Sequence, residues 1–238
     1  MAKASSDWKV LPHRPLEKLG ENLWRVEGDL EGMPLKRVMI VARRGDGALV
    51  LHNCIALGED EMAKLQALGP IGYLVVPNGF HRLDIGRFKA RYPQAKVLCP
   101  RGSREKVAEV VAVDGTYEDF PPDDAVTLTT LEGTAAREGV MLVRSPEGAT
   151  VVFNDVLFNM PHLSGVHGFV FKHLTKSSGG LRVSRISRLF LIKDKKALRE
   201  HLLRLADTPQ LRRIAVAHHE TYTGDAAAAL RGVAATLG

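Results

Sequence analysis

Three short, mainly apolar runs constrain the fold of this chain most strongly, because each ends in a group of polar residues. The runs cover residues 71–77, 150–154 and 213–217. Short apolar runs without polar alternation are typical of strands that are buried on both faces. The polar residues that follow them therefore lie where the chain leaves a buried sheet, and layered α/β proteins often build their sites there.

Helix-like and strand-like segments surround these runs in an order that repeats along the chain. Apolar spacing predicts helices at residues 59–68, 83–92, 103–111, 194–206 and 226–237. Further β-rich runs predict strands at residues 21–29, 35–42, 48–52, 95–99, 125–131 and 139–145. The order fits an α/β protein with a four-layer αββα sandwich, in which mixed β-sheets carry outer helices, better than a doubly wound sheet.

The same pattern divides the chain into an arm and a domain. Residues 1–20 are polar and contain two prolines, so we expect an N-terminal arm that could wrap a partner subunit in a homodimer. Residues 21–238 are expected to form a single domain. Within it, residues 155–191 show little periodicity and are predicted to be a long loop.

Basic residues are concentrated in one part of the chain. The formal net charge is +6, yet residues 172–213 contain twelve basic and three acidic side chains. Such asymmetry is typical of a solvated helix face and loop, or of a surface that meets a polyanion. No zinc knuckle or RNA-binding aromatic signature accompanies the charge, so the sequence does not favour nucleic acid as a partner. The role of the basic loop 172–193 stays open.

Composition excludes several other classes. Two cysteines cannot form a disulfide framework, and the first twenty residues contain no apolar signal segment, so we expect a cytoplasmic protein. No run approaches the ~18 apolar residues of a membrane-spanning helix. Neither a G-x-S-x-G elbow nor a glycine-rich phosphate loop occurs.

The polar groups after the three apolar runs are the candidate site. They contain Asn78, His81 and Asp84 after the first run, Asp155 after the second, and the pair His218 and His219 after the third. Histidine and carboxylate side chains are the ligand types of zinc and iron sites. Each residue also has an ordinary structural explanation, such as a helix cap, a turn or a polar surface. Their occurrence together at three strand ends favours a site.

The order of elements and these strand ends resemble the metallo-β-lactamase superfamily. The segments VVPNGFHRLDIGRFKARYPQAKVLCPRG, NDVLFN and KDKKALREHLLRLADTPQLRRIAVAHHE are similar to a branch of uncharacterised bacterial and plant proteins with that fold. The resemblance covers roughly residues 20–236. It implies that Asp155 matches the metal-bridging aspartate and that His218 matches the last ligand histidine.

The sequence departs from the metal motif of that superfamily, which reads His-x-His-x-Asp-His. Asn78 and Phe80 stand at its first two histidines, and Arg82 and Leu83 stand at its aspartate and third histidine. His81 falls between these positions, and Thr134 stands where a further ligand histidine is usual. The motif is therefore degenerate, and the resemblance no longer implies the usual binuclear zinc centre.

Two functional classes remain open. The one we favour from sequence is a metal-free protein that binds a small anionic ligand or partner in the former cleft. Asn78, Arg82 and His219 would bind that ligand, since the arginine fork matches carboxylate and phosphate.

The alternative is a mononuclear metal-dependent hydrolase that cleaves an ester, lactone, thioester or phosphoester. Here His81, Asp155 and His218 would hold one zinc, iron or manganese ion, with Asp84 or His219 as a further candidate ligand. If the protein has hydrolytic chemistry, Asp155 and His218 are its expected central catalytic pair.

Overall fold

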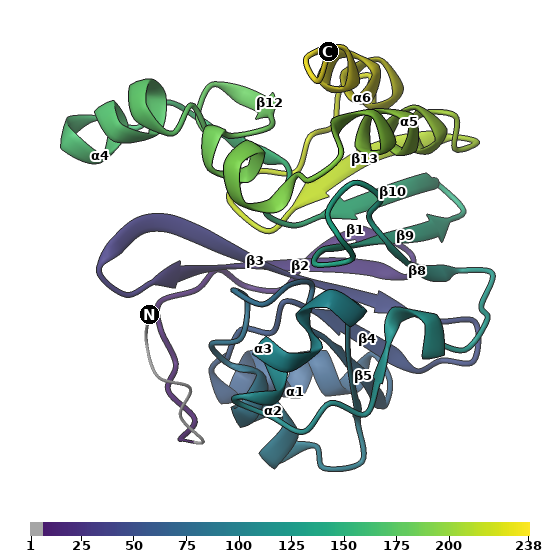
Figure 1. Ribbon diagram of the computed structural model, residues 1–238. Helices are drawn as coiled ribbons and strands as arrows, with labels where there is room; N and C mark the ends of the chain where they lie inside the picture. Colours follow the sequence, from purple (N-terminus) through teal and green to yellow (C-terminus); the bar gives the residue numbers. More distant parts are fainter. Residues whose placement is uncertain (1–6) are drawn as a thin grey trace.

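Two β-sheets pack face to face and helices cover both outer faces (Figure 1). The structure is a computed structural model that describes residues 7–238. The predicted four-layer αββα sandwich is confirmed. Among the described residues, no helix is long and apolar enough to cross a bilayer.

The larger sheet contains seven strands in chain order. They are β1 (Glu17–Gly20), β2 (Leu23–Leu30), β3 (Met33–Arg43), β4 (Leu49–His52), β5 (Ile71–Val75), β6 (Lys96–Cys99) and β7 (Gly115–Thr116). The first four strands pair antiparallel, and β4 to β7 pair parallel. This mixture follows from the connections, since β1 to β4 are joined by short turns whereas α1 and α2 separate β4, β5 and β6.

The smaller sheet has the strand order β13-β10-β9-β8. Its members are β8 (Val126–Thr130), β9 (Gly139–Ser145), β10 (Gly148–Phe153) and β13 (Leu211–Val216). The central strand β10 pairs antiparallel with β9 and parallel with β13, and all six of its residues are buried. The carboxyl ends of β10 and β13 therefore meet at one edge of the sheet.

Helices pack on each outer face through separate apolar clusters. The first group, beside the larger sheet, is α1 (Glu59–Ala67), α2 (Ile85–Arg91) and α3 (Arg104–Ala108). The second group, beside the smaller sheet, is α5 (Lys195–Ala206) and α6 (Ala226–Ala235). A third cluster, which includes Leu23, Ile40, Met141 and Val152, fills the space between the sheets.

The predicted long loop at 155–191 contains regular structure. The strands β11 (Phe158–Met160) and β12 (Gly180–Arg182) form a separate antiparallel pair. Between and after them lie α4 (Gly165–Phe169) and two π-helical turns, η3 (Val170–Leu174) and η4 (Ser187–Leu191). Short 3₁₀ turns also occur at η1 (Arg101–Ser103) and η2 (Tyr117–Asp119).

The predicted N-terminal arm, over the part that the structure describes, contacts the rest of its own chain. The Trp8 indole donates a hydrogen bond to the Leu57 carbonyl at 2.9 Å and its ring lies 5.0 Å from the Phe88 ring. His13 accepts from the Gly58 amide, and Glu17–Gly20 is an edge strand. The arm therefore packs against its own domain from Trp8 onward, while residues 1–6 lie outside the described part.

Candidate metal centre

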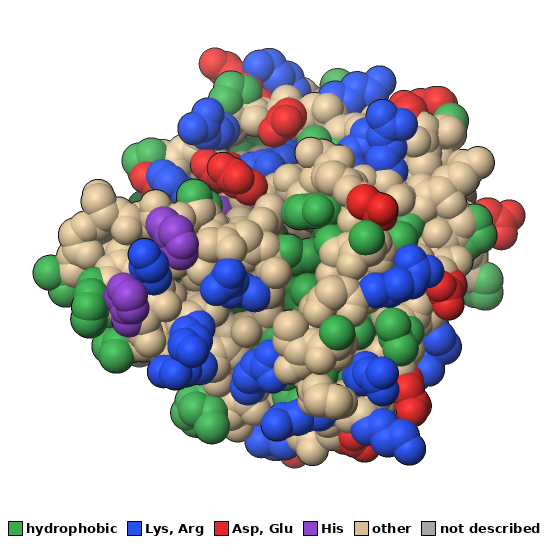
Figure 2. All heavy atoms as spheres, turned by 90° about the horizontal axis from the view of Figure 1, so that it is seen from above, with side chains coloured by type: hydrophobic (Ala, Val, Ile, Leu, Met, Phe, Trp, Pro, Cys, Tyr) green, Lys and Arg blue, Asp and Glu red, His purple; other side chains and the backbone are tan. Residues whose placement is uncertain are grey.

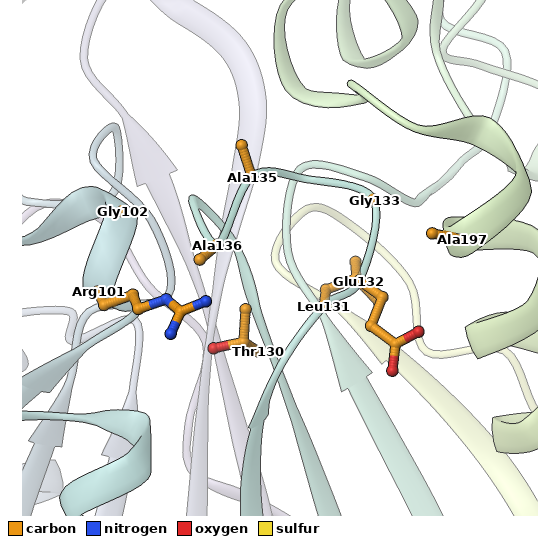
Figure 3. A pocket seen from close by; sticks show the side chains of 9 residues that line it. All are labelled: Arg101, Gly102, Thr130, Leu131, Glu132, Gly133, Ala135, Ala136 and Ala197. Atoms are coloured by element: carbon orange, nitrogen blue, oxygen red, sulfur yellow. The ribbon is translucent and has the colours of Figure 1, made fainter.

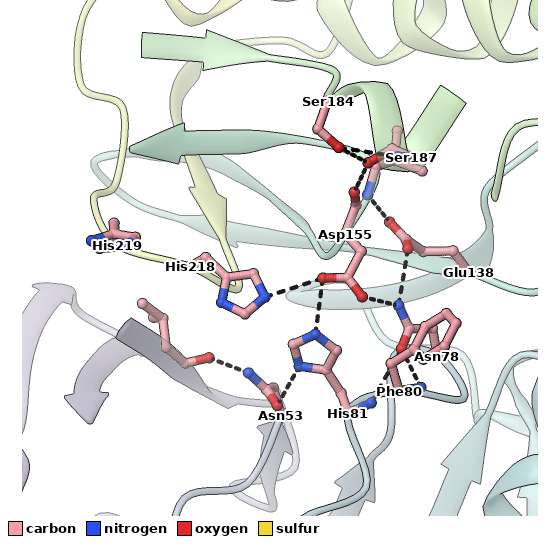
Figure 4. Close-up of polar contacts among 12 residues, drawn as sticks. Asn53, Asn78, Phe80, His81, Glu138, Asp155, Ser184, Ser187, His218 and His219 are labelled. Atoms are coloured by element: carbon pink, nitrogen blue, oxygen red, sulfur yellow. Dashed lines mark hydrogen bonds and ion pairs between the residues drawn. The ribbon is translucent and has the colours of Figure 1, made fainter. Parts of the chain in front are cut away.

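Three strand ends from both sheets place His81, Asp155 and His218 together (Figure 4). His81 lies in the turn between β5 and α2, Asp155 follows β10, and His218 follows β13. The strand pairings fix these positions, because β10 lies in parallel register with β13 and β5 pairs with both β4 and β6. The sequence grouped these residues as a candidate site at three strand ends, and the structure brings their three side chains together.

Both histidines point the same nitrogen at one carboxylate oxygen. His81 Nε2 lies 3.0 Å from Asp155 Oδ1, and His218 Nε2 lies 3.1 Å from the same atom. The possible ligand atoms of the three side chains all lie within 4.8 Å of one another. The two imidazole rings are 5.1 Å apart, and Phe158 stacks on the His218 ring at 5.4 Å.

The opposite nitrogen of each histidine has an acceptor. His81 Nδ1 lies 2.9 Å from Asn53 Oδ1, and His218 Nδ1 lies 2.9 Å from the Lys36 carbonyl. Asn53 donates its own amide to the Val38 carbonyl at 2.8 Å, which leaves its oxygen facing His81. These acceptors assign a proton to both Nδ1 atoms, so in the neutral rings the Nε2 lone pairs face Asp155.

This arrangement brings three electron-rich atoms together. Two Nε2 lone pairs facing one carboxylate oxygen repel it unless positive charge lies between them. The charge can come from added protons, which turn the rings into imidazolium, or from a metal cation. Nδ1–H bonds to carbonyl oxygens are also the usual way in which proteins orient metal-ligating histidines.

The Asn78 side chain orients both Asp155 and the turn that carries His81. Its side-chain nitrogen donates to Asp155 Oδ2 at 2.7 Å and to Glu138 Oε2 at 3.1 Å. Its oxygen accepts from the Phe80 and His81 amides, which shapes the turn that carries His81. Asn78 was predicted to bind a ligand, and the structure shows it orienting Asp155 and the His81 turn.

Two further residues of the cluster were missed from the sequence. Glu138 is fully buried and accepts from the Val156 amide at 2.8 Å. The Ser187 hydroxyl donates to the Asp155 carbonyl oxygen. Glu138 directly precedes the predicted strand at 139–145, and a lone acid at the start of a buried strand is the signal that could have identified it.

The two carboxyl groups have opposite pKa shifts. Burial, reinforced by the charge of Asp155, raises the pKa of Glu138 to about 8. Burial would also raise the pKa of Asp155, but His81 and His218, when protonated, outweigh it through their charge and hydrogen bonds and hold that pKa well below the usual value. The cluster therefore keeps its negative charge on Asp155, between the two imidazoles.

The remaining predicted site residues contact other groups. Arg82 donates to the Glu109 carboxylate at 2.7 Å and to the Lys106 carbonyl. His219 accepts from the Lys36 amide at 3.4 Å, and burial lowers its pKa to about 4. Asp84, considered as a further ligand, is buried between Arg37 and Arg87 and does not join the cluster.

The loop before β9 does not add a ligand. The Thr134 hydroxyl donates to the Leu131 carbonyl at 2.6 Å, within the loop. A cavity of about 760 Å³ lies beside this loop, and Arg101, Thr130, Glu132 and Ala135 are among its lining residues (Figure 3). None of the three clustered residues lines it, so the cavity is separate from the candidate metal centre.

Comparison with known structures identifies the fold. A metallo-β-lactamase from Pontibacter korlensis superimposes with a TM-score of 0.60 at 11% identity, covering 92% of this chain and 98% of that one. The Hirschia baltica metallo-β-lactamase gives a TM-score of 0.58 at 11% identity, covering 93% and 98%. The metallo-β-lactamase DIM-1, exposed to ceftazidime, gives 0.62 at 11% identity, covering 97% and 100%.

The chain therefore has the metallo-β-lactamase fold, as its sequence resemblance implied. No protein-family model and no curated protein matches the sequence. At 11% identity the likeness concerns the backbone alone, so the chemistry of this chain has to be argued from its own side chains.

Proposed function

We propose that this protein is a mononuclear metal-dependent hydrolase in which His81, Asp155 and His218 hold one divalent ion. The observation that carries the proposal is the convergence of both Nε2 atoms on Asp155 Oδ1, with each Nδ1 bonded to an oxygen acceptor. A cation between these atoms would replace repulsion by coordination.

The donor set fits a catalytic ion. Two imidazoles and one carboxylate bind zinc in several hydrolases, and the same set binds non-haem iron(II). Three protein ligands leave room for a further ligand, and an ion held in this way supplies Lewis acidity that activates water towards an ester-type bond. Zinc, iron and manganese are the candidate ions, and esters, lactones, thioesters and phosphoesters are the candidate substrates.

The surrounding residues of this chain would keep the ligands in place. Asn53 and the Lys36 carbonyl hold the two rings in the required tautomer, and Asn78 holds the second oxygen of Asp155. Glu138, with its raised pKa, limits the negative charge that is buried beneath the cluster. In this arrangement the negative charge of Asp155 would neutralise part of the charge of the ion.

A metal-free protein that binds an anion is the second candidate, and one observation favours it. Asn78, Phe80, Arg82 and Leu83 stand at the four motif positions that carry ligands in the superfamily. In that case doubly protonated histidines would flank Asp155 as ion pairs. Against it, the guanidinium of Arg82 already pairs with Glu109.

Hydrolysis assays on metal-loaded protein test the proposal. Activated carboxylic esters, a lactone, a thioester and an activated phosphoester should be compared with parent protein, Asp155→Asn and His218→Ala. We expect turnover that chelator abolishes and that both variants lose by about 100-fold or more. His167→Ala, an exposed histidine on α4, is the matched control and should retain full activity.

Turnover that is unaffected by chelator and by both substitutions would contradict the proposal. Binding of an anion that His219→Ala or Arg82→Ala abolishes, without any metal requirement, would instead support the second candidate.

A further inference from the structure

The segment 164–193, which contains α4 and β12 and projects from the rest of the fold in Figure 1, has an unusual surface. Nine large apolar side chains are exposed among the described residues, and six of them lie in this one segment. They are Val166, Phe169, Leu174, Ile186, Leu189 and Phe190. Exposed apolar side chains concentrated in this way mark a contact surface rather than ordinary surface variation.

The charge of the same segment has one sign. It contains no aspartate or glutamate, and its six basic residues are Lys172, Lys176, Arg182, Arg185, Arg188 and Lys193. None of these six forms an ion pair with a carboxylate in the described part of the chain. Figure 2 shows apolar, basic and histidine side chains side by side on the projecting lobe.

A groove next to these side chains is also basic. It has a volume of about 660 Å³ between β12, η4 and α6 and is lined by Lys176, Arg182, Arg185 and Arg188, together with apolar residues such as Leu181 and Val233. Among residues 7–238, the Arg188 guanidinium bonds only to the carbonyl and hydroxyl of Thr236. The groove thus offers cations beside apolar surface, with no carboxylate among its lining residues.

We propose that segment 164–193 is a docking surface for a membrane that contains anionic lipids. Exposed Phe and Leu side chains insert at the boundary between head groups and acyl chains, and unpaired Lys and Arg side chains contact the anionic head groups. Segment 164–193 would lie at the boundary between membrane and water and would not span the bilayer. A second copy of the chain fits less well, because a symmetric dimer would place these cations against themselves.

Vesicle co-sedimentation of the full chain tests this inference. The probes are vesicles of phosphatidylcholine alone and vesicles of phosphatidylcholine with phosphatidylserine, each at low and high salt. We expect binding to the mixed vesicles that is at least about tenfold stronger than binding to phosphatidylcholine and that weakens with salt.

Variants distinguish the two contributions. Replacing Lys172 and Arg185 by Gln should weaken binding by about 25-fold, since each cation near the surface contributes about fivefold. The double change Leu189→Ser and Phe190→Ser should weaken it by at least about tenfold at either salt concentration. Lys18→Gln and Met33→Ser are the matched controls, since each removes an exposed side chain of the same kind outside segment 164–193. Both should bind vesicles like the parent.

Three results would overturn the inference. The first two are the absence of binding to mixed vesicles and equal binding by all variants. The third is a concentration-dependent dimer that the Leu189→Ser and Phe190→Ser change abolishes, which would make this surface an interface between copies of the chain. Asp155→Asn removes a candidate metal ligand but leaves segment 164–193 unchanged, so it should bind vesicles like the parent. Vesicle binding and metal binding can therefore succeed or fail independently.

Discussion

Two aspartates in this protein each lie between two basic side chains, and the difference between their partners separates a structural cluster from a candidate site. Asp84 pairs with Arg37 and Arg87, and the three side chains are between 1% and 7% exposed. Asp155 lies between His81 and His218, and its side chain is 14% exposed. Both aspartates follow a buried strand, and both were candidate ligands from the sequence.

The partner type decides what each aspartate can do. A guanidinium always carries its charge, has five donors and has no lone pair for a metal, so Asp84 is committed to neutralising two buried cations. An imidazole can release its proton and present a lone pair. The two histidines beside Asp155 can therefore exchange a proton for a metal ion. Two basic neighbours around a carboxylate therefore do not imply the same chemistry.

The largest expected effect tests the structural role of Asp84. Asp84→Asn leaves two buried guanidinium groups without a countercharge and should lower the free energy of unfolding by about 3–5 kcal/mol. Asp155→Asn, studied with chelator present, should cost only about 1 kcal/mol, because neutral histidines can accept from the new amide. Urea unfolding of both variants measures the difference. A cost for Asp155→Asn that equals the cost for Asp84→Asn would show that both clusters are structural.

The second prediction concerns the acceptor of His81. Asn53 has a φ of +61°, so Asn53→Gly keeps a permitted backbone while it removes the oxygen that faces His81 Nδ1. We expect metal affinity to fall by about 10- to 100-fold, the usual effect of removing such a partner. Metal titration by calorimetry measures it.

Asn53→Asp is the matched control for that experiment. Both variants lose the donor to the Val38 carbonyl, but only the aspartate retains an acceptor for His81. Its affinity should equal or exceed that of the parent. If both variants lose affinity equally, the bond to His81 Nδ1 does not orient a metal ligand.

The third prediction concerns a histidine that has no carboxylate partner among the described residues. His52 on β4 is completely buried, neither ring nitrogen has a hydrogen-bond partner in the part of the chain that the structure describes, and burial lowers its pKa to about 3 from the usual 6.5. The unfolded chain takes up a proton below pH 6.5 and the folded protein does not. Its contribution to stability is therefore full above pH 6.5 and is lost as the pH falls towards 3.

His52→Leu should remove this pH dependence. As the pH falls from 6.5 to 3, the free energy of unfolding of the variant should rise relative to that of the parent by at most about 1.4 kcal/mol per pH unit. Thermal unfolding at pH 7 and at pH 5 measures the gain. The same slope in both proteins would indicate that His52 finds a partner that neutralises its charge.

Much of the architecture could be predicted from the sequence, because buried strands carry strong local signals. The run that became β10 is buried along its whole length, β5 and β13 are buried and apolar towards their carboxyl ends, and helix α5 has a clear apolar stripe. The strands β11 and β12 and the π-helical turns were not predicted, because residues 155–191 lack periodicity and depend on contacts with the rest of the fold.

The site was predictable only where its residues follow strong strands. Asp155 and His218 are identified by the runs that precede them, and His81 by its place after β5. The sequence could not show that Arg82 pairs with Glu109, 27 residues later, or that Glu138 reaches Asn78 across 60 residues. Such pairs depend on how distant segments pack, which local patterns do not record.

Metal content measured by inductively coupled plasma mass spectrometry tests the central claim most directly. Tag-free parent protein, Asp155→Ala and His218→Ala should be dialysed without chelator, loaded with zinc, iron or manganese, and dialysed again. We predict about one equivalent of one metal in the parent and less than about a tenth of an equivalent in both variants. Less than a tenth of an equivalent in the loaded parent, or equal metal in all three proteins, would contradict a metal centre at His81, Asp155 and His218.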